Sequence, residues 1–340
     1  MYQVAYLPIL SLLLCWHYQA RAKEVGEEVV IRDLIKDLLK YLPAQIAPAV
    51  MGLITIPIIT RLFPPADYGN YILVTATVSI FATFVGWLSM SIIRFYPVYE
   101  QDGRLPVIYG TVVRWLLVSV AVLAAIFLGI AFVVKNHLKT QLYYLMLIGT
   151  LLFVFTAVFE VLQQFLRSKR WAGLYSAFSI WKNVVGLLIG LGLAMGLGCG
   201  VEALLWGSVL SSFVALPFLW RSVLGKTRWK ETNSVGLARE MAKYGFPLVV
   251  GNLAAWILSL SDRYVLEFFR GAQEVGIYSI SYTISEKSIV LLTSLFMFAS
   301  GPISMSVWEK EGVAKSQEFL TKLTRYYLII CLPIVVSLSV

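Results

Sequence analysis

Apolar residues gather along this chain in runs of about twenty positions, and a run of that length crosses a bilayer as one α-helix. We expect eight complete spans, over residues 42–63, 72–93, 115–134, 143–166, 174–197, 201–220, 245–266 and 276–298. A ninth run opens near Tyr326 and stops at Val340, after about 15 of the roughly 20 residues that a span needs. We therefore expect this last helix to be truncated. The pattern predicts an all-α polytopic membrane protein.

The composition agrees with burial in lipid. Hydrophobic residues make up 59% of the chain and charged residues 14%, against about 25% charged residues in soluble proteins. The net charge of +9 would indicate nucleic acid in a soluble protein, whereas in a membrane protein Lys and Arg collect in cytoplasmic loops. We expect membrane lipids around the chain and no nucleic-acid partner.

The positions of Lys and Arg predict the orientation. If the N-terminus lies in the cytoplasm, most of the 28 Lys and Arg residues fall in cytoplasmic loops. The opposite side then holds a small set, namely Arg61, Lys135, Lys139, Arg263 and Arg270. We therefore expect a multi-pass protein with a cytoplasmic N-terminus.

Residues 1–40 form a predicted cytoplasmic N-terminal segment. Residues 1–16 are apolar but too short to span, and they lack the features of a signal peptide. Residues 21–40 are charged and amphipathic, with Val30, Leu34 and Leu38 on one face, which fits a helix lying on the membrane surface. An authentic start nearer Val30 is the alternative for this segment.

Two stretches of the chain repeat each other. Residues 41–71 open with Tyr-x-Pro, residues 244–278 open with Tyr-x-x-Pro, and both close with an acidic residue followed by x-Gly-x-Tyr. The copies fall on the first and seventh spans, so both enter the membrane in the same direction. Parallel repeats of this kind are a transporter architecture.

The repeat predicts a two-lobed helical bundle of six-helix repeats. The first lobe covers residues 41–220 and a basic cytoplasmic linker covers 221–243. The second lobe begins at 244–340 with two full helices and part of a third. We expect this second lobe to be truncated.

The amino-acid sequences of these repeats resemble those of a known family. The segments ITRLFPPADYGNY and SDRYVLEFFRGAQEVGIYSISYTI are similar to the polysaccharide biosynthesis, or Wzx-type oligosaccharide flippase, family. That family belongs to the multidrug/oligosaccharidyl-lipid/polysaccharide exporter superfamily, and the resemblance covers residues 35–340. It implies two lobes around a central cavity in the inner membrane. It also implies translocation of lipid-diphosphate-linked oligosaccharides from the cytoplasmic to the outer leaflet.

Several residues carry this resemblance, and we expect them to be structural rather than substrate-binding. Around the first outer loop, Pro64 and Pro65 stop a helix and Gly69 permits a tight turn. Asp262 and Arg263 lie near the outer end of the seventh span, where water is close. The set of motif residues is Arg61, Asp67, Gly69, Tyr71, Asp262, Arg263, Gly276 and Tyr278.

Two ionisable residues within predicted spans are candidates for a substrate cavity. Lys182 lies in the fifth span beside Ser176, Ser179 and Asn183, and Glu160 lies at a similar depth in the fourth. An ion pair between them would either neutralise two buried charges or line the cavity. In the second case Lys182 would hold a diphosphate, and Glu160 would couple to protons or another cation. Snorkelling of Lys182 to the interface is a further alternative.

The eighth span carries a second candidate set. Tyr278, Tyr282 and Glu286 recur at i, i+4 and i+8, and Glu286 and Lys287 fall near the bilayer midplane. Tyrosines on a cavity wall can stack on sugar rings, and Lys287 could face another helix or the ligand. Interlobe packing through a buried charged pair is the alternative.

The sequence offers little for enzyme chemistry. Its three cysteines are far apart and its two histidines lie at the ends of apolar runs, so we expect no metal and no cofactor. A glycan polymerase would carry a long basic outer loop, and the outer loops here are short. An acyltransferase would pair a histidine with a carboxylate, yet His137 is flanked by Lys135 and Lys139. We therefore expect a non-enzyme.

Within transporters, two alternatives to an oligosaccharide flippase stay open. One is a cation-coupled drug exporter and the other is a peptidoglycan-precursor flippase of the same superfamily. Cavity size and charge would separate them. For the flippase, the expected partners are a lipid-linked oligosaccharide, a coupling proton or sodium ion, and polysaccharide polymerase and glycosyltransferase enzymes.

Overall fold

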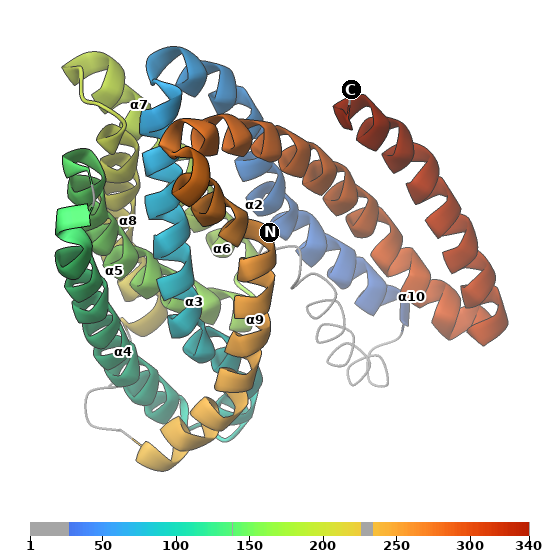
Figure 1. Ribbon diagram of the computed structural model, residues 1–340. Helices are drawn as coiled ribbons and strands as arrows, with labels where there is room; N and C mark the ends of the chain where they lie inside the picture. Colours follow the sequence, from blue (N-terminus) through green and yellow to red (C-terminus); the bar gives the residue numbers. More distant parts are fainter. Residues whose placement is uncertain (1–26, 138, 226–233, 340) are drawn as a thin grey trace. The chain divides into compact units, whose positions relative to one another are not determined.

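The computed structural model describes residues 27–137, 139–225 and 234–339, and every element within them is helical (Figure 1). The first half consists of long helices joined by short turns: α2 (Glu27–Leu62), α3 (Pro65–Gln101), α4 (Leu105–Val134), the short 3₁₀ helix η1 (Lys135–His137) and α5 (Thr140–Ser168). The second half follows with α6 (Ala172–Ile180), the π-helical segment η2 (Trp181–Val185), α7 (Gly186–Leu197), α8 (Glu202–Leu224), α9 (Val235–Arg270) and α10 (Ala272–Ser339).

Six helices among the described residues are long and apolar enough to cross a membrane. They are α3, α4, α5, the combined α6–η2–α7 run Ala172–Leu197, α8 and α9. These six coincide with the second to seventh predicted spans, which confirms an all-α polytopic membrane protein. The first predicted span lies in α2, where the apolar part Ile46–Leu62 is shorter. The eighth lies in α10, whose apolar run is interrupted by Glu286 and Lys287.

Two helices extend beyond the boundaries expected from the sequence. Helix α2 runs without interruption from Glu27 into the first span, and the position of its first turns on the membrane surface stays a prediction. The helix is uninterrupted because residues 27–42 contain neither Gly nor Pro to end it. Helix α10 bends at Gly312, whose φ of 76° is non-helical. The last helical stretch therefore begins directly after Gly312, upstream of the expected Tyr326.

The described residues divide into two compact units. One unit runs from Ile58 to Ser279, and the other combines the described residues up to Pro57 with those from Ile280 onward. This division does not follow the predicted lobe boundaries, because α9 packs along α3 inside the larger unit. The extent of the lobes therefore stays a prediction.

In the larger unit, α5 packs against α3, α4 and α8 and forms the centre of the bundle. Aromatic side chains fill the space between these helices. Phe81 stacks on Phe127 with ring centroids 4.6 Å apart, and Tyr109 meets Phe165 at 4.9 Å. Burying such rings and their aliphatic neighbours holds α5 in a fixed rotation, which decides where its polar side chains point.

Glycines bring α7 and α8 into direct backbone contact. A Cβ atom on Gly207 would lie 2.4 Å from the carbonyl oxygen of Gly186 and 2.4 Å from the amide nitrogen of Gly190. Only glycine leaves room for this approach, which is a common device between helices in membranes. The close crossing places the middle of α8 against the segment that precedes Gly186.

Candidate functional site

The two candidate charges of the first cavity set lie together. The Nζ atom of Lys182, in η2, is 3.1 Å from Oε1 of Glu160, in α5. The Lys182 side chain is 19% exposed and that of Glu160 is 49% exposed. The ammonium group also lies 5.2 Å from the centroid of the Phe159 ring. The structure therefore forms the ion pair that the sequence suggests, with the carboxylate more accessible than the amine.

The helix is not α-helical where it carries Lys182. Residues Trp181–Val185 form a π-helical turn, which holds one residue more than an α-helical turn. The amide of Asn183 donates to the carbonyl oxygen of Ser179 at 2.8 Å. Such turns occur frequently at functional sites. Sequence periodicity does not reveal this turn, because an extra residue shifts the phase of the helix without changing its composition.

The serines expected beside Lys182 take a different position. Ser176 and Ser179 are 5% and 3% exposed, so they lie in the packing between helices, whereas Asn183 is exposed. Gln163 of α5 fixes the neighbouring turn by donating to the carbonyl oxygen of Tyr175 at 3.1 Å. The accessible polar groups of this set are therefore Glu160, Lys182 and Asn183.

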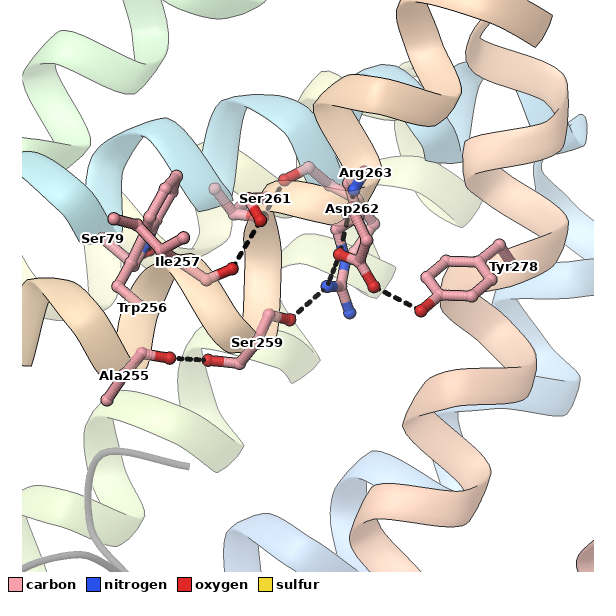
Figure 2. A network of polar contacts seen from close by, with 11 residues as sticks. Ser79, Ala255, Trp256, Ile257, Ser259, Ser261, Asp262, Arg263 and Tyr278 are labelled. Carbon is pink, nitrogen blue, oxygen red and sulfur yellow. Dashed lines mark hydrogen bonds and ion pairs between the residues drawn. The ribbon is translucent and has the colours of Figure 1, made fainter.

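The motif residues Asp262 and Arg263 form a polar network with Tyr278 (Figure 2). The Arg263 guanidinium lies 3.2 Å from Oδ1 of Asp262 and donates to the carbonyl oxygen of Ser259 at 2.6 Å. The Tyr278 hydroxyl donates to the other carboxylate oxygen of Asp262. Arg263 is only 4% exposed, so the expectation that water is close to it is wrong. The guanidinium is paired instead by Asp262 and the Ser259 carbonyl oxygen, and Tyr278, from the second turn of α10, donates to Asp262.

Of the remaining motif residues outside the glycines, Asp67 joins two helix ends, whereas Tyr71 and Arg61 do not. Gln141 donates to Asp67 Oδ1 at 2.9 Å and accepts from Asn70 at 3.2 Å, which fixes the start of α5 to the start of α3. Tyr71 stacks on Tyr68 with centroids 5.8 Å apart. Arg61, in the last turn of α2, is exposed.

Gly69 and Gly276 serve close packing. Both lie inside helices, so the expectation that Gly69 permits a turn is wrong. Phe63 and Pro64 make the turn between α2 and α3, and Gly69 lies within contact of Ala272 at the start of α10. A side chain at this position would enter the backbone of the other helix.

Sequence reasoning missed a row of polar contacts between α3 and α9. The Trp256 indole donates to Ser79 Oγ at 2.8 Å, and the Thr77 and Tyr264 hydroxyls are 2.7 Å apart. Nearer the start of α9, Ser91 donates to the carbonyl oxygen of Met241 at 2.8 Å. The Ser and Thr residues that recur along α3 were the available signal, since hydroxyls join helices in membranes.

A lysine outside the spans was also missed. Lys169 follows α5, donates to the carbonyl oxygen of Val223 at 2.9 Å and lies 4.8 Å from the centroid of the Trp171 ring. Burial lowers the pKa of this amine, and the charge of Glu100 partly opposes the shift. Lys169 thus donates to a carbonyl group in the last turn of α8.

The second candidate set lies mostly in the other unit. Lys287 on α10 lies along α2, since a Cβ atom on Gly52 would stand 3.6 Å from its Cγ and Cε atoms. Tyr282 and Glu286 are partly exposed on the same helix. Their role in binding stays a prediction. Within the described residues, no group of three or more His, Cys, Asp or Glu side chains is placed to hold a metal ion.

Comparison with known proteins identifies one family and one fold. The family model described as "Polysaccharide biosynthesis protein" matches residues 34–308. No curated protein sequence matches the chain. The structure of the MATE multidrug transporter DinF-BH superposes with a TM-score of 0.65 at 17% identity, covering 86% of this chain and 71% of that one.

Two further solved structures share the fold. A MATE protein in complex with MaL6 has a TM-score of 0.62 at 16% identity, covering 89% of this chain and 71% of that one. An outward-facing MATE family transporter of the MOP superfamily has 0.58 at 15% identity, covering 89% and 72%. The chain spans from 66% to 72% of the length of such structures. At these identities the likeness shows the fold alone.

Proposed function

The chain belongs to the polysaccharide biosynthesis protein family, and on that basis we propose that it is a flippase for lipid-diphosphate-linked oligosaccharide repeat units. The direction proposed is from the inner to the outer leaflet of the cytoplasmic membrane, with the N-terminus in the cytoplasm. The product would serve the assembly of surface polysaccharide or O-antigen. The fold supports a transporter rather than an enzyme, since proteins with this fold are described as transporters.

The observation that carries the proposal is the Glu160–Lys182 ion pair within otherwise apolar spans. An ionisable side chain at membrane depth costs at least about 2.5–3.5 kcal/mol on insertion scales, so such residues commonly mark substrate pathways. An ammonium group is a compact charge that can hold a diphosphate. We assign this role to Lys182, and we assign Asn183 to the wall beside it, whereas Ser179 is buried and accepts the Asn183 amide through its carbonyl oxygen.

Glu160 serves in this proposal as the partner of Lys182 when no substrate is bound. A diphosphate that engages Lys182 leaves the Glu160 carboxylate without its counter-charge and beside new negative charge. Both changes favour uptake of a cation by the carboxylate. Glu160 is therefore the proposed site where a proton or sodium ion couples to transport.

In the other unit, Tyr282 and Lys287 are proposed substrate contacts, with Glu286 as a charged neighbour. A tyrosine ring can pack on the apolar face of a sugar and its hydroxyl can hydrogen-bond the ring substituents. The proposed partners of the protein are the polymerase that consumes the flipped repeat and the glycosyltransferases that supply it.

One specific observation favours a second candidate function. The solved structures with this fold include multidrug transporters, DinF-BH among them. A cation-coupled drug exporter of the same superfamily would use an accessible carboxylate for a cationic drug, and Glu160 is 49% exposed. The proposed flippase needs Lys182 as well as Glu160, whereas a cation exporter needs only the carboxylate.

A strain deleted for the gene tests the proposal. Surface polysaccharide is measured together with the leaflet distribution of its polyprenyl-diphosphate-linked repeat. The flippase proposal predicts loss of surface display and accumulation of the intact lipid-linked repeat in the cytoplasmic leaflet. Normal display combined with altered drug tolerance would support the exporter instead.

A further inference from the structure

The π-helical turn around Lys182 is held by one side chain of α8. Ser211 lies opposite the turn and is 0% exposed. Its Oγ is 3.2 Å from the carbonyl oxygen of Trp181 and 3.4 Å from that of Lys182, so the two carbonyl groups share its single hydroxyl proton. In return, the Trp181 indole donates to the carbonyl oxygen of Ser211 at 3.1 Å.

These contacts meet the particular need of a widened turn. A π-helical turn shifts the hydrogen-bond pattern of the backbone and needs partners for the carbonyl groups that it disturbs. Ser211 supplies a hydroxyl donor to two successive carbonyl groups, and the indole fixes Trp181 in place. The turn is thereby joined to α8 by two donors, the Ser211 hydroxyl and the Trp181 indole.

The backbone contact between α7 and α8 brings Ser211 within reach. A Cβ atom on Gly186, directly after the turn, would lie 3.3 Å from the Cβ atom of Ser211. Gly190 packs one turn further on, where a Cβ atom would lie 3.0 Å from Cα of Leu204. The helix after the turn is therefore fixed against α8 by its backbone, which leaves little freedom for the turn to move as a whole.

The direction of the Lys182 side chain depends on this turn. An α-helix rotates by about 100° per residue, so one extra residue changes which face the preceding side chains occupy. With the π-helical turn in place, the Lys182 ammonium reaches Glu160 at 3.1 Å. If the turn relaxed to α-helical geometry, Lys182 and the residues before it would rotate relative to Gly186 and α7.

We infer that Ser211 is a positioning residue, which acts through the π-helical turn to aim Lys182 at Glu160 and so sets where a substrate diphosphate is held. The inference rests on the proposed function for the part that concerns the diphosphate. The geometric part, that Ser211 sets the position of Lys182, is independent of any substrate. Neither the family motif nor the charged pair itself includes Ser211.

The chain offers a matched control in the next residue. Ser212 is also 0% exposed, and its Oγ has no hydrogen-bond partner among the described residues. Ser211→Ala and Ser212→Ala therefore remove the same atom from adjacent buried positions. Only the first removes contacts with the π-helical turn. Trp181→Phe is a second variant, which removes the indole donor and keeps an aromatic ring.

The first experiment reads geometry without substrate. Glu160→Cys and Lys182→Cys are combined in a full-length chain whose own cysteines are replaced by serine, and a short bifunctional thiosulfonate joins the two positions. Loss of the Ser211 contacts is expected to slow cross-linking by about 2- to 10-fold. Ser212→Ala is expected to leave the rate unchanged, and Trp181→Phe to slow it less than Ser211→Ala. Equal rates in the two serine variants would overturn the inference.

The second experiment measures flipping with Lys182 present. Ser211→Ala is expected to raise the substrate concentration for half-maximal flipping by about 2- to 10-fold without changing the amount of inserted protein. Ser212→Ala is expected to leave both quantities at their wild-type values. If cross-linking slows but Lys182→Ala flips normally, Ser211 positions residue 182 and the proposed role of Lys182 in holding the diphosphate fails. If Lys182→Ala abolishes flipping but cross-linking is insensitive to Ser211, the proposed function stands and the positioning role fails.

Discussion

Gly69 and Gly276 make equivalent contacts with each other's helices. A Cβ atom on Gly69 would lie 1.9 Å from the carbonyl oxygen of Ala272, and one on Gly276 would lie 2.0 Å from that of Pro65. Ala272 precedes Gly276 by the same interval as Pro65 precedes Gly69. The repeated acidic-x-Gly-x-Tyr motif therefore marks a reciprocal crossing between the first turns of α3 and of α10.

Alanine at either glycine is expected to destabilise the protein. The added methyl group meets backbone atoms, which cannot rotate away, so the two helices must separate. Overpacking of this kind costs about 1–3 kcal/mol. Thermal unfolding of Gly69→Ala and Gly276→Ala in detergent measures the loss. Gly86→Ala on α3 is the control, since a Cβ atom there meets nothing within 4 Å. If Gly69→Ala unfolded at the same midpoint temperature as Gly86→Ala, the close contact between Gly69 and Ala272 would be contradicted.

Removing Arg263 is expected to have a large effect on stability. The Arg263→Met variant leaves the Asp262 carboxylate with Tyr278 but without its counter-charge. Breaking a fully buried pair on one side costs about 3–5 kcal/mol, and because the Asp262 side chain left behind is 37% exposed, we expect about 1–3 kcal/mol here. The measurement is the unfolding midpoint of purified protein. Arg270→Met, at an exposed position on the same helix, is expected to change stability by no more than about 0.5 kcal/mol. Similar midpoints for both variants would show that the network contributes little.

The lowered pKa of Lys169 predicts how stability depends on pH. Because burial disfavours the charged amine in the folded protein, the unfolded chain binds more protons in the range between the lowered pKa and the ordinary value of 10.5. Stability of the wild type relative to Lys169→Met should therefore rise as pH rises through that range. Unfolding midpoints of both proteins, compared from neutral to alkaline pH, provide the measurement. A difference that is constant or falls with pH would contradict the burial of the charged amine.

The spans were predictable because each depends on a local property of the chain. A run of apolar residues as long as the bilayer is thick must be helical, whatever surrounds it. The ion pair was also within reach, since Glu160 and Lys182 lie at similar distances from the loop that joins their helices. Two opposite charges at equal depth on neighbouring spans are expected to pair, because pairing lowers the free-energy cost of placing each charge in the membrane.

The features that were not predictable depend on contacts between distant residues. The burial of Arg263 follows from the packing of α10, which sequence spacing does not give. The π-helical turn depends on Ser211, far along the chain from Lys182. Glycine is typical of turns, so the sequence suggests a turn at Gly69. Its role in packing depends on Ala272, which is distant in sequence and lies beside it in the structure.

The most direct test of the account is to measure flipping by a protein in which the Glu160–Lys182 ion pair is replaced by neutral side chains. The double variant Glu160→Gln with Lys182→Met leaves no unpaired charge and is expected to insert normally, because neutral replacement of a whole ion pair is tolerated. The matched control is Glu318→Gln with Lys322→Met, which removes an exposed ion pair of 2.7 Å on α10. If Lys182 holds the diphosphate and Glu160 takes up the coupling cation, the first variant should lose about 10- to 100-fold in flipping of the lipid-linked repeat, and the control should flip normally. Normal flipping by the first variant would show that the pair is structural and would contradict the account.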